Sequence, residues 1–225
     1  MPRSAASTTT SESACKHSLP DGTYRKSRAV PPHSPALPIL SEHQNLICWD
    51  RASAIFRGTL KANLGFPEQA RDRYPAVIVV HTIAGYRDAN EGYVAAELRK
   101  AGFVTLTYDS FAARRTTGTA LQGSPSYLPI GVADAYAALR LLSGEGRIDA
   151  GHIAIVGFSY GAEVAHLTAL ETLRSALNPG PGRFAAHVAF YPGGNFGAVA
   201  EPGAYTDSPV LMLLGVPHSA CRRRA

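Results

Sequence analysis

Apolar residues along the chain form short unbroken runs that alternate with segments of helical periodicity. Residues 76–80 are apolar at every position, which is typical of a strand buried on both faces of a sheet. Val94, Leu98 and Ala101 then recur at helical spacing. Gly102 follows directly, where a helix commonly ends in a left-handed residue. This part of the chain therefore predicts a strand followed by a helix.

The same alternation continues to residue 214. Further strands are predicted at residues 103–108, 152–158, 184–191 and 209–214. Two further helices are predicted from apolar residues at helical spacing: one carries Val132, Tyr136 and Leu139, and the other carries Val164, Leu167 and Leu170. Before them, residues 54–60 alternate as a short, antiparallel edge strand, and residues 61–74 read as a polar connection. Strands that alternate with helices imply right-handed crossovers. The pattern predicts an α/β fold, a mostly parallel sheet with helices on both faces.

Composition divides the chain into three parts. The first 45 residues mix Ser, Thr, Pro and basic residues without periodicity, which predicts a disordered lead-in. Residues 46–215 form the predicted folded domain, and residues 216–225 an irregular basic tail. With 225 residues, 45% of them hydrophobic, the chain can bury one sizeable core.

Charge and cysteine content narrow the classes of function. The formal net charge of +5 comes from the two ends of the chain, while the body is balanced, so we expect no nucleic-acid partner. No apolar run is long enough to cross a bilayer and no secretory signal precedes the domain, so we expect no membrane association. Cys15, Cys48 and Cys221 form no Cys-x-x-Cys pair, which argues against a disulfide framework or a metal site. A cytoplasmic protein without a cofactor is the simplest expectation, with a transit peptide as the alternative for the first residues.

The segment Gly157-Phe158-Ser159-Tyr160-Gly161 lies between a predicted strand and a predicted helix. This is the context of a nucleophile elbow, Gly-x-Ser-x-Gly, in which a strained turn presents the serine above the sheet. Glycines on both sides let strand and helix approach closely. Ser159 is the candidate catalytic nucleophile; the alternative is a tight turn with an incidental serine.

Acyl transfer also needs donors for the oxyanion that develops on the substrate. The Tyr160 amide at the start of the next helix supplies one. The loop after the first buried strand supplies the second candidate, the amide of Ile83. We expect His81, at the start of that loop, to hold the loop, with substrate binding as its functional alternative.

Together these segments resemble the dienelactone hydrolase family of α/β-hydrolases. The resemblance rests on residues 75–109, on the Gly-Phe-Ser-Tyr-Gly elbow and on residues 207–215, and it covers about residues 53–215. It implies hydrolysis of a small-molecule carboxylic ester or lactone. It also implies that an arginine of the loop after residue 109 holds a substrate carboxylate, which makes Arg114 the candidate, with Arg115 close behind. Many members use a cysteine nucleophile; Ser159 points to the ester-hydrolysing branch.

The chain departs from the family after Gly215. No carboxylate side chain follows Asp207, and the catalytic histidine, last strand and last helix of the family are missing, so we expect a truncated or frameshifted end. His218 is a weak substitute, and Asp109 is expected to cap the loop that follows it. Asp207 is expected at the opposite sheet edge from Ser159, and structural roles are expected for His166 and His187.

Two other functions stay open at this point. A non-catalytic small-molecule binding module would keep the pocket without the chemistry. A nucleotide-binding α/β protein is the third alternative, although the chain lacks both Gly-x-Gly-x-x-Gly and a Walker A pattern. The oligomeric state is not predicted.

Overall fold

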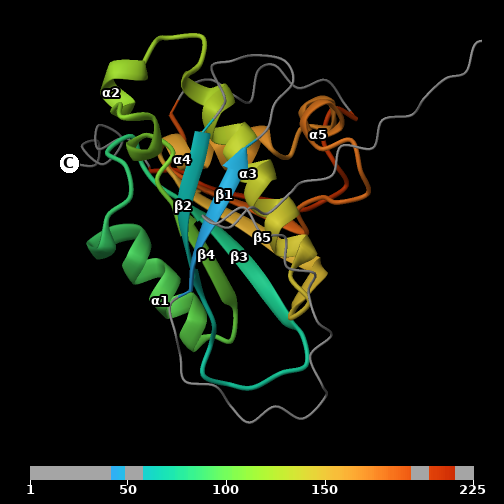
Figure 1. The fold of residues 1–225 in the computed structure, drawn as a ribbon. Helices are drawn as coiled ribbons and strands as arrows, with labels where there is room; N and C mark the ends of the chain where they lie inside the picture. The colour runs from blue at the N-terminus through green and yellow to red at the C-terminus, as the bar shows by residue number, and fades with distance from the viewer. Residues whose placement is uncertain (1–41, 49–57, 194–202, 216–225) are drawn as a thin grey trace, which may run out of the picture. The chain divides into compact units, whose positions relative to one another are not determined.

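A computed structural model describes residues 42–48, 58–193 and 203–215 of the chain (Figure 1). All of them belong to one compact unit, Ala36–Ala225, while a separate unit, Met1–Pro35, lies outside the described residues. Most of the predicted disordered lead-in lies outside these ranges, and only its residues 42–45 are described. The predicted basic tail, residues 216–225, also lies outside them.

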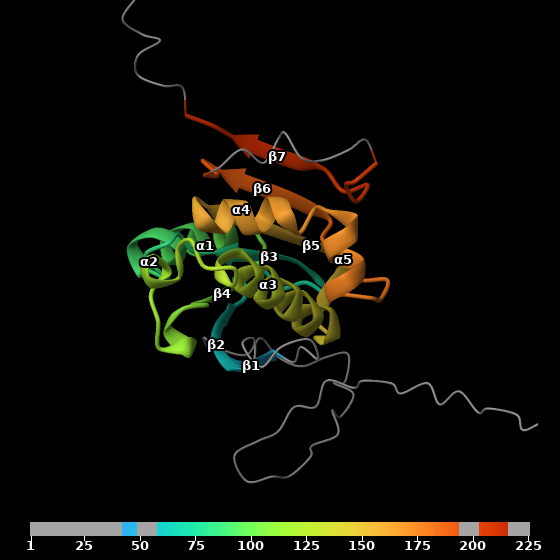
Figure 2. The ribbon, with the colours of Figure 1, turned by 90° about the horizontal axis from the view of Figure 1, so that it is seen from above.

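Seven strands form one sheet in the order β1-β2-β4-β3-β5-β6-β7, and Figure 2 shows this order from the β1 edge to the β7 edge. The first two pairings, β1 with β2 and β2 with β4, are antiparallel, and all others are parallel. The strands are β1 Glu42–Cys48, β2 Gly58–Gly65, β3 Tyr74–Val80, β4 Val104–Tyr108, β5 Ile148–Phe158, β6 Ala186–Phe190 and β7 Val210–Leu213.

Helices cover both faces of the sheet, as predicted. The helical elements are η2 Asp88–Gly92, α1 Tyr93–Lys100, η3 Ala112–Arg114, α2 Gly118–Leu121, α3 Tyr127–Gly144, α4 Tyr160–Leu167 and α5 Glu171–Leu177. On β3, Ile78 and Val80 belong to the larger core beneath α3 and α4, and Val77 and Val79 belong to the core beneath α1. The apolar run of β3 thus reflects a strand that packs against helices on both sides. No helix in the described ranges has the length and apolar character that a membrane crossing requires.

The predicted end of the first helix is confirmed. Gly102 has φ +92°, and its N–H donates to the carbonyl of Arg99. Only glycine adopts this left-handed conformation without steric cost, so it ends the helix and starts β4.

The sequence placed the first strands incorrectly. Part of the predicted polar connection is strand β2, in which buried Leu60, Ala62 and Leu64 alternate with exposed Lys61 and Asn63. This is the period of a strand with one buried face, and it was obscured by the polar residues between the apolar ones. Strand β1 also begins before residue 46, inside the predicted lead-in. The first part of the strand predicted at residues 54–60 lies outside the described residues.

The helix predicted through Leu170 is interrupted. Helix α4 ends at Leu167, and Leu170 is extended and forms a bridge with Tyr205 before α5 begins. The apolar spacing of Val164 and Leu170 therefore spans two elements rather than one helix.

Strand β7 forms an apolar edge among the described strands. Its four residues, Val210, Leu211, Met212 and Leu213, are 37–54% exposed. Asp207 lies in a bend before this strand, and β7 runs parallel to β6. Asp207 therefore lies at the amino ends of the parallel strands, opposite the carboxyl ends where Ser159 lies, as predicted.

Acidification should destabilise the fold through His187. This side chain is 1% exposed on β6, and burial lowers the pKa of its ring to about 4, against partial compensation from the Pro209 and Thr168 carbonyls. Between pH 6.5 and 4 the His187 ring is protonated in the unfolded chain but not in the folded one. The free energy of unfolding should therefore fall by about 3 kcal/mol as the pH drops from 6.5 to 4. Urea unfolding across this range measures the effect. In His187→Leu the free energy of unfolding should depend less on pH between 6.5 and 4 than in the wild type. An equal pH dependence in the two proteins would assign the effect to other groups.

Candidate active site

Strand β5 passes directly into helix α4 through a single strained residue, Ser159. Its backbone has φ 52° and ψ −112°, a conformation that residues other than glycine rarely adopt. The turn is held from both sides, because the Ser159 N–H donates to the Phe190 carbonyl at 2.9 Å and its own carbonyl accepts from the Ala162 amide at 2.9 Å. The strain is therefore compensated by the β6 end and by the first turn of α4.

The two glycines of the motif allow this turn. A Cβ on Gly157 would lie 1.9 Å from the Gly161 carbonyl oxygen, and a Cβ on Gly161 would lie 2.4 Å from the Val80 carbonyl oxygen. Such distances are far below van der Waals contact. The expectation that both glycines permit a close approach of strand and helix is confirmed.

The Ser159 side chain is half-buried, and its hydroxyl forms no hydrogen bond with any described residue. The Tyr160 N–H, at the start of α4, also has no acceptor within the described ranges. A helix start with free N–H groups favours a neighbouring negative charge. The Ser159 hydroxyl and the Tyr160 N–H donor are thus on adjacent residues.

The loop after β3 contains the second proposed donor. Ile83 is half-buried, and its N–H has no acceptor among the described residues. Its carbonyl oxygen faces Gly118 at the start of α2, where a Cβ would lie 2.3 Å from that oxygen. Helix α2 thus begins in close contact with the carbonyl of Ile83.

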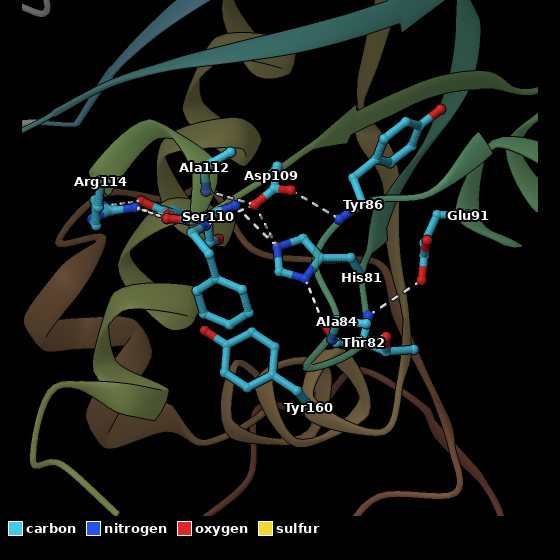
Figure 3. A network of polar contacts seen from close by, with 12 residues as sticks. His81, Thr82, Ala84, Tyr86, Glu91, Asp109, Ser110, Ala112, Arg114 and Tyr160 are labelled. Carbon is cyan, nitrogen blue, oxygen red and sulfur yellow. Dashed lines mark hydrogen bonds and ion pairs between the residues drawn. The ribbon is translucent and has the colours of Figure 1, made fainter. Parts of the chain in front are cut away.

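His81 is fully buried and connects the β3 loop to the loop after β4 (Figure 3). Its Nε2 lies 2.9 Å from the backbone N of Ser110, and its Nδ1 lies 2.6 Å from the carbonyl oxygen of Thr82. A backbone amide can only donate, so Nε2 accepts and Nδ1 carries the proton. The ring packs against Phe111 and Tyr160 at centroid distances of 4.9 and 5.8 Å. This geometry supports the loop-holding role of His81 and leaves neither nitrogen for a substrate or for the Ser159 proton.

Asp109 caps the loop after β4, as expected. Its carboxylate accepts hydrogen bonds from the amides of Tyr86, Phe111 and Ala112 at 2.8–3.0 Å. Burial by itself would raise the pKa of this carboxyl, but the three backbone donors outweigh it and hold the pKa below its usual value. The carboxylate therefore fixes the two loops that follow β3 and β4 at the carboxyl ends of the parallel strands.

Arg114 is a structural ion-pair residue in this fold. Its two terminal nitrogens lie 2.9 and 2.8 Å from the carboxylate oxygens of Asp134, and Nη1 also donates to the Ser110 carbonyl. The Asp134 side chain is fully buried, and that of Arg114 is 10% exposed. The role suggested for Arg114, binding a substrate carboxylate, conflicts with this geometry because the guanidinium already faces a buried carboxylate. Arg115, for which the same role was considered, adopts a left-handed backbone conformation at the end of η3.

The other predicted histidines lie away from the elbow. His166 and His187 are buried on α4 and β6, and the His166 Nε2 lies 2.8 Å from the Tyr205 hydroxyl. His218 lies outside the described residues. Within the described part of the chain, no histidine contacts Ser159, and no cluster of three potential metal ligands occurs.

Sequence reasoning missed several residues that organise the site. Asp134 had a detectable signal, because a single carboxylate within the apolar run Ile130–Leu139 implies a buried partner. Glu163, one turn beyond Ser159, is half-buried; burial raises its pKa, while the Gly193 amide opposes the shift. Glu91 and Gly118 had no signal, because their roles depend on contacts with the β3 loop.

The sequence pattern of the dienelactone hydrolase family matches residues 60–216 of this chain. The chain belongs to the dienelactone hydrolase family. The match includes the β3 loop, the elbow and β7, so the elements that surround Ser159 are those of a family of hydrolases. No match was found among curated proteins.

Solved structures support the α/β-hydrolase fold of this family member. The structure named m3DLH is 22% identical, with 80% of this chain and 73% of that chain covered and a TM-score of 0.56. A dienelactone hydrolase-like promiscuous phosphotriesterase from metagenomic libraries is 20% identical, with 79% and 69% covered and a TM-score of 0.56. At these identities the likeness shows the fold alone.

The chain spans only about half the length of some similar structures. The chain spans 46% of the α/β hydrolase GrgF from Penicillium sp. sh18, at 21% identity with 69% of this chain covered and a TM-score of 0.49. It spans 49% of a hypothetical protein from Pseudomonas aeruginosa, at 18% identity with 75% covered and a TM-score of 0.51.

Replacing Gly157 should prevent the tight turn at Ser159 from forming. In Gly157→Ala the new methyl group collides with backbone that cannot move independently, so we expect a loss of at least about 3 kcal/mol or no folding. Urea unfolding followed by circular dichroism measures this loss. Gly146→Ala is the matched control, because no atom lies within 4 Å of its Cβ position. Equal stabilities of the two variants would contradict the packing described above.

Replacing Arg114 should act on stability rather than on substrate binding. Arg114→Leu leaves the Asp134 carboxylate buried without its cation, at an expected cost of about 3–5 kcal/mol. Combining it with Asp134→Leu should restore most of the lost stability, measured by thermal unfolding. If Arg114→Leu kept the wild-type Tm and only raised KM, Arg114 would be a substrate ligand after all.

Proposed function

We propose that this chain hydrolyses a small-molecule carboxylic ester or lactone with Ser159 as its nucleophile. The observation that carries the proposal is the strained backbone of Ser159, whose hydroxyl and neighbouring Tyr160 N–H have no hydrogen-bond partner among the described residues. Strain of this kind at a strand-to-helix turn is typical of a nucleophile elbow. Membership in a hydrolase family supports a small-molecule substrate.

In the proposed reaction, the Ser159 oxygen forms a bond to the carbonyl carbon of the ester. The carbonyl oxygen becomes an oxyanion that accepts from the amides of Ile83 and Tyr160. Collapse of this intermediate breaks the ester C–O bond and releases the alcohol, which takes up the hydroxyl proton. Water then cleaves the acyl-serine to the carboxylic acid and regenerates the hydroxyl.

No proton carrier is assigned to this reaction, because no described histidine or carboxylate forms a hydrogen bond with the Ser159 hydroxyl. His81 has both ring nitrogens engaged. Oxyanion stabilisation without a base still accelerates acyl transfer by roughly 10³–10⁴ over water in triad knockouts. We therefore expect weak but measurable turnover of an activated ester by the chain as it stands.

A fluorophosphonate probe tests the nucleophile directly. In the native protein the Ser159 oxygen should form a bond to the phosphorus of the probe and displace fluoride as HF, and peptide mapping should locate the phosphonyl adduct on that residue. Ser159→Ala should abolish both the adduct and the hydrolysis of p-nitrophenyl acetate above background. Heat-denatured protein is the control for non-specific reaction.

A non-catalytic binding module is the second candidate. It is favoured by the engagement of both nitrogens of His81, the one histidine described in the elbow loops. A folded protein whose Ser159 does not react with the probe would support this function and contradict the hydrolase proposal.

A further inference from the structure

The β3 loop, residues 82–87, is held by a buried carboxylate that belongs to neither the loop nor the elbow. Glu91, in η2, is fully buried. Its Oε1 accepts from the Thr82 N–H at 3.2 Å, and its Oε2 accepts from the Arg87 N–H at 3.0 Å. One carboxylate therefore connects the first and last residues of the loop, and Figure 3 shows the contact to Thr82.

Glu91 has no basic partner among the described residues. None of the ion pairs within the described ranges includes it. A buried carboxylate without a cation is costly, and it persists only where hydrogen bonds to it are needed for a particular geometry. Here those hydrogen bonds come entirely from loop amides.

The remaining amides of the loop are also engaged, with one exception. The Ala84 N–H lies 3.2 Å from the Thr82 hydroxyl oxygen, the Gly85 N–H donates to the Thr82 carbonyl, and the Tyr86 N–H donates to Asp109. Of the six amides at residues 82–87, that of Ile83 is therefore the one without an acceptor among the described residues. The hydrogen bonds of the loop select the donor that stays available.

We propose that Glu91 is a positioning residue that fixes the conformation of the β3 loop and so keeps the Ile83 N–H free for the oxyanion. This inference rests on the proposed hydrolase function. Glu91 touches no reacting atom; it acts through the Thr82 and Arg87 amides. A donor fixed before substrate binds does not have to be reorganised during the reaction, and this is the condition under which it lowers the barrier.

The decisive variant is Glu91→Gln, which keeps the size of the side chain. A glutamine offers one acceptor oxygen, and its NH₂ group faces a loop amide that can only donate. We expect faster hydrogen exchange at the Thr82 or Arg87 amide and a second-order rate of Ser159 labelling by fluorophosphonate about 10- to 100-fold lower. For p-nitrophenyl acetate, kcat should fall while KM stays close to that of the wild type.

Two controls separate loop positioning from general destabilisation. Glu97→Gln alters an exposed carboxylate of α1 that pairs only with Lys100, and it should change neither exchange nor labelling. Tyr136→Phe removes a buried hydrogen bond to the Thr168 carbonyl, and it should lower Tm without changing the labelling rate of the folded protein. Should Glu91→Gln fail to fold, Glu91→Asp retains the charge but is too short to span both amides, and it should show the same loss.

The outcomes distinguish this inference from the function on which it rests. Wild-type labelling and exchange rates in folded Glu91→Gln would overturn the role of Glu91 while leaving the nucleophile intact. A wild-type protein whose Ser159 is inert would overturn the proposed function. In that case hydrogen exchange alone still decides whether Glu91 anchors the loop.

Discussion

The close approach of strand β5 and helix α4 is the constraint on which the rest of the site depends. It requires two positions without a Cβ, Gly157 and Gly161, and it forces the intervening Ser159 into a left-handed conformation. Because β5 lies between β3 and β6, the same turn is reached by the β3 loop on one side and by the Phe190 carbonyl on the other. The chemistry available at this edge follows from that one backbone geometry.

Acidic side chains that are buried or partly buried then give the surrounding loops a defined shape. Asp109 accepts amides from two loops, Glu91 connects both ends of one loop, and Asp134 holds Arg114 beneath the loop after β4. None of the three forms a hydrogen bond with Ser159. These carboxylates orient the backbone amides and the guanidinium around the elbow.

The sequence predicted the parts of the fold that depend on local patterns. The apolar run of β3, the helix ending at Gly102 and the elbow glycines were each recognisable within a few residues. Strand β2 was missed because its alternation includes Lys61 and Asn63, which resemble a polar connection when read singly. The role suggested for Arg114 came from a resemblance and could not anticipate Asp134, twenty positions later, which reaches the guanidinium only in the folded chain.

The proposal of Ile83 as an oxyanion donor draws on the hydrogen bonds of the β3 loop as well as on the elbow motif. A Gly-x-Ser-x-Gly sequence says nothing about which amide of a distant loop is available. Five of the six amides of residues 82–87 donate hydrogen bonds, and that of Ile83 has no acceptor among the described residues. The Tyr160 amide has none because the first N–H groups of a helix have no acceptor within the helix. Two independent features, the hydrogen bonds within the β3 loop and the start of α4, thus leave the amides of Ile83 and Tyr160 without acceptors among the described residues. Preorganised donors of this kind favour developing negative charge whether or not a base is present, which is why the nucleophile can be tested before the proton carrier is known.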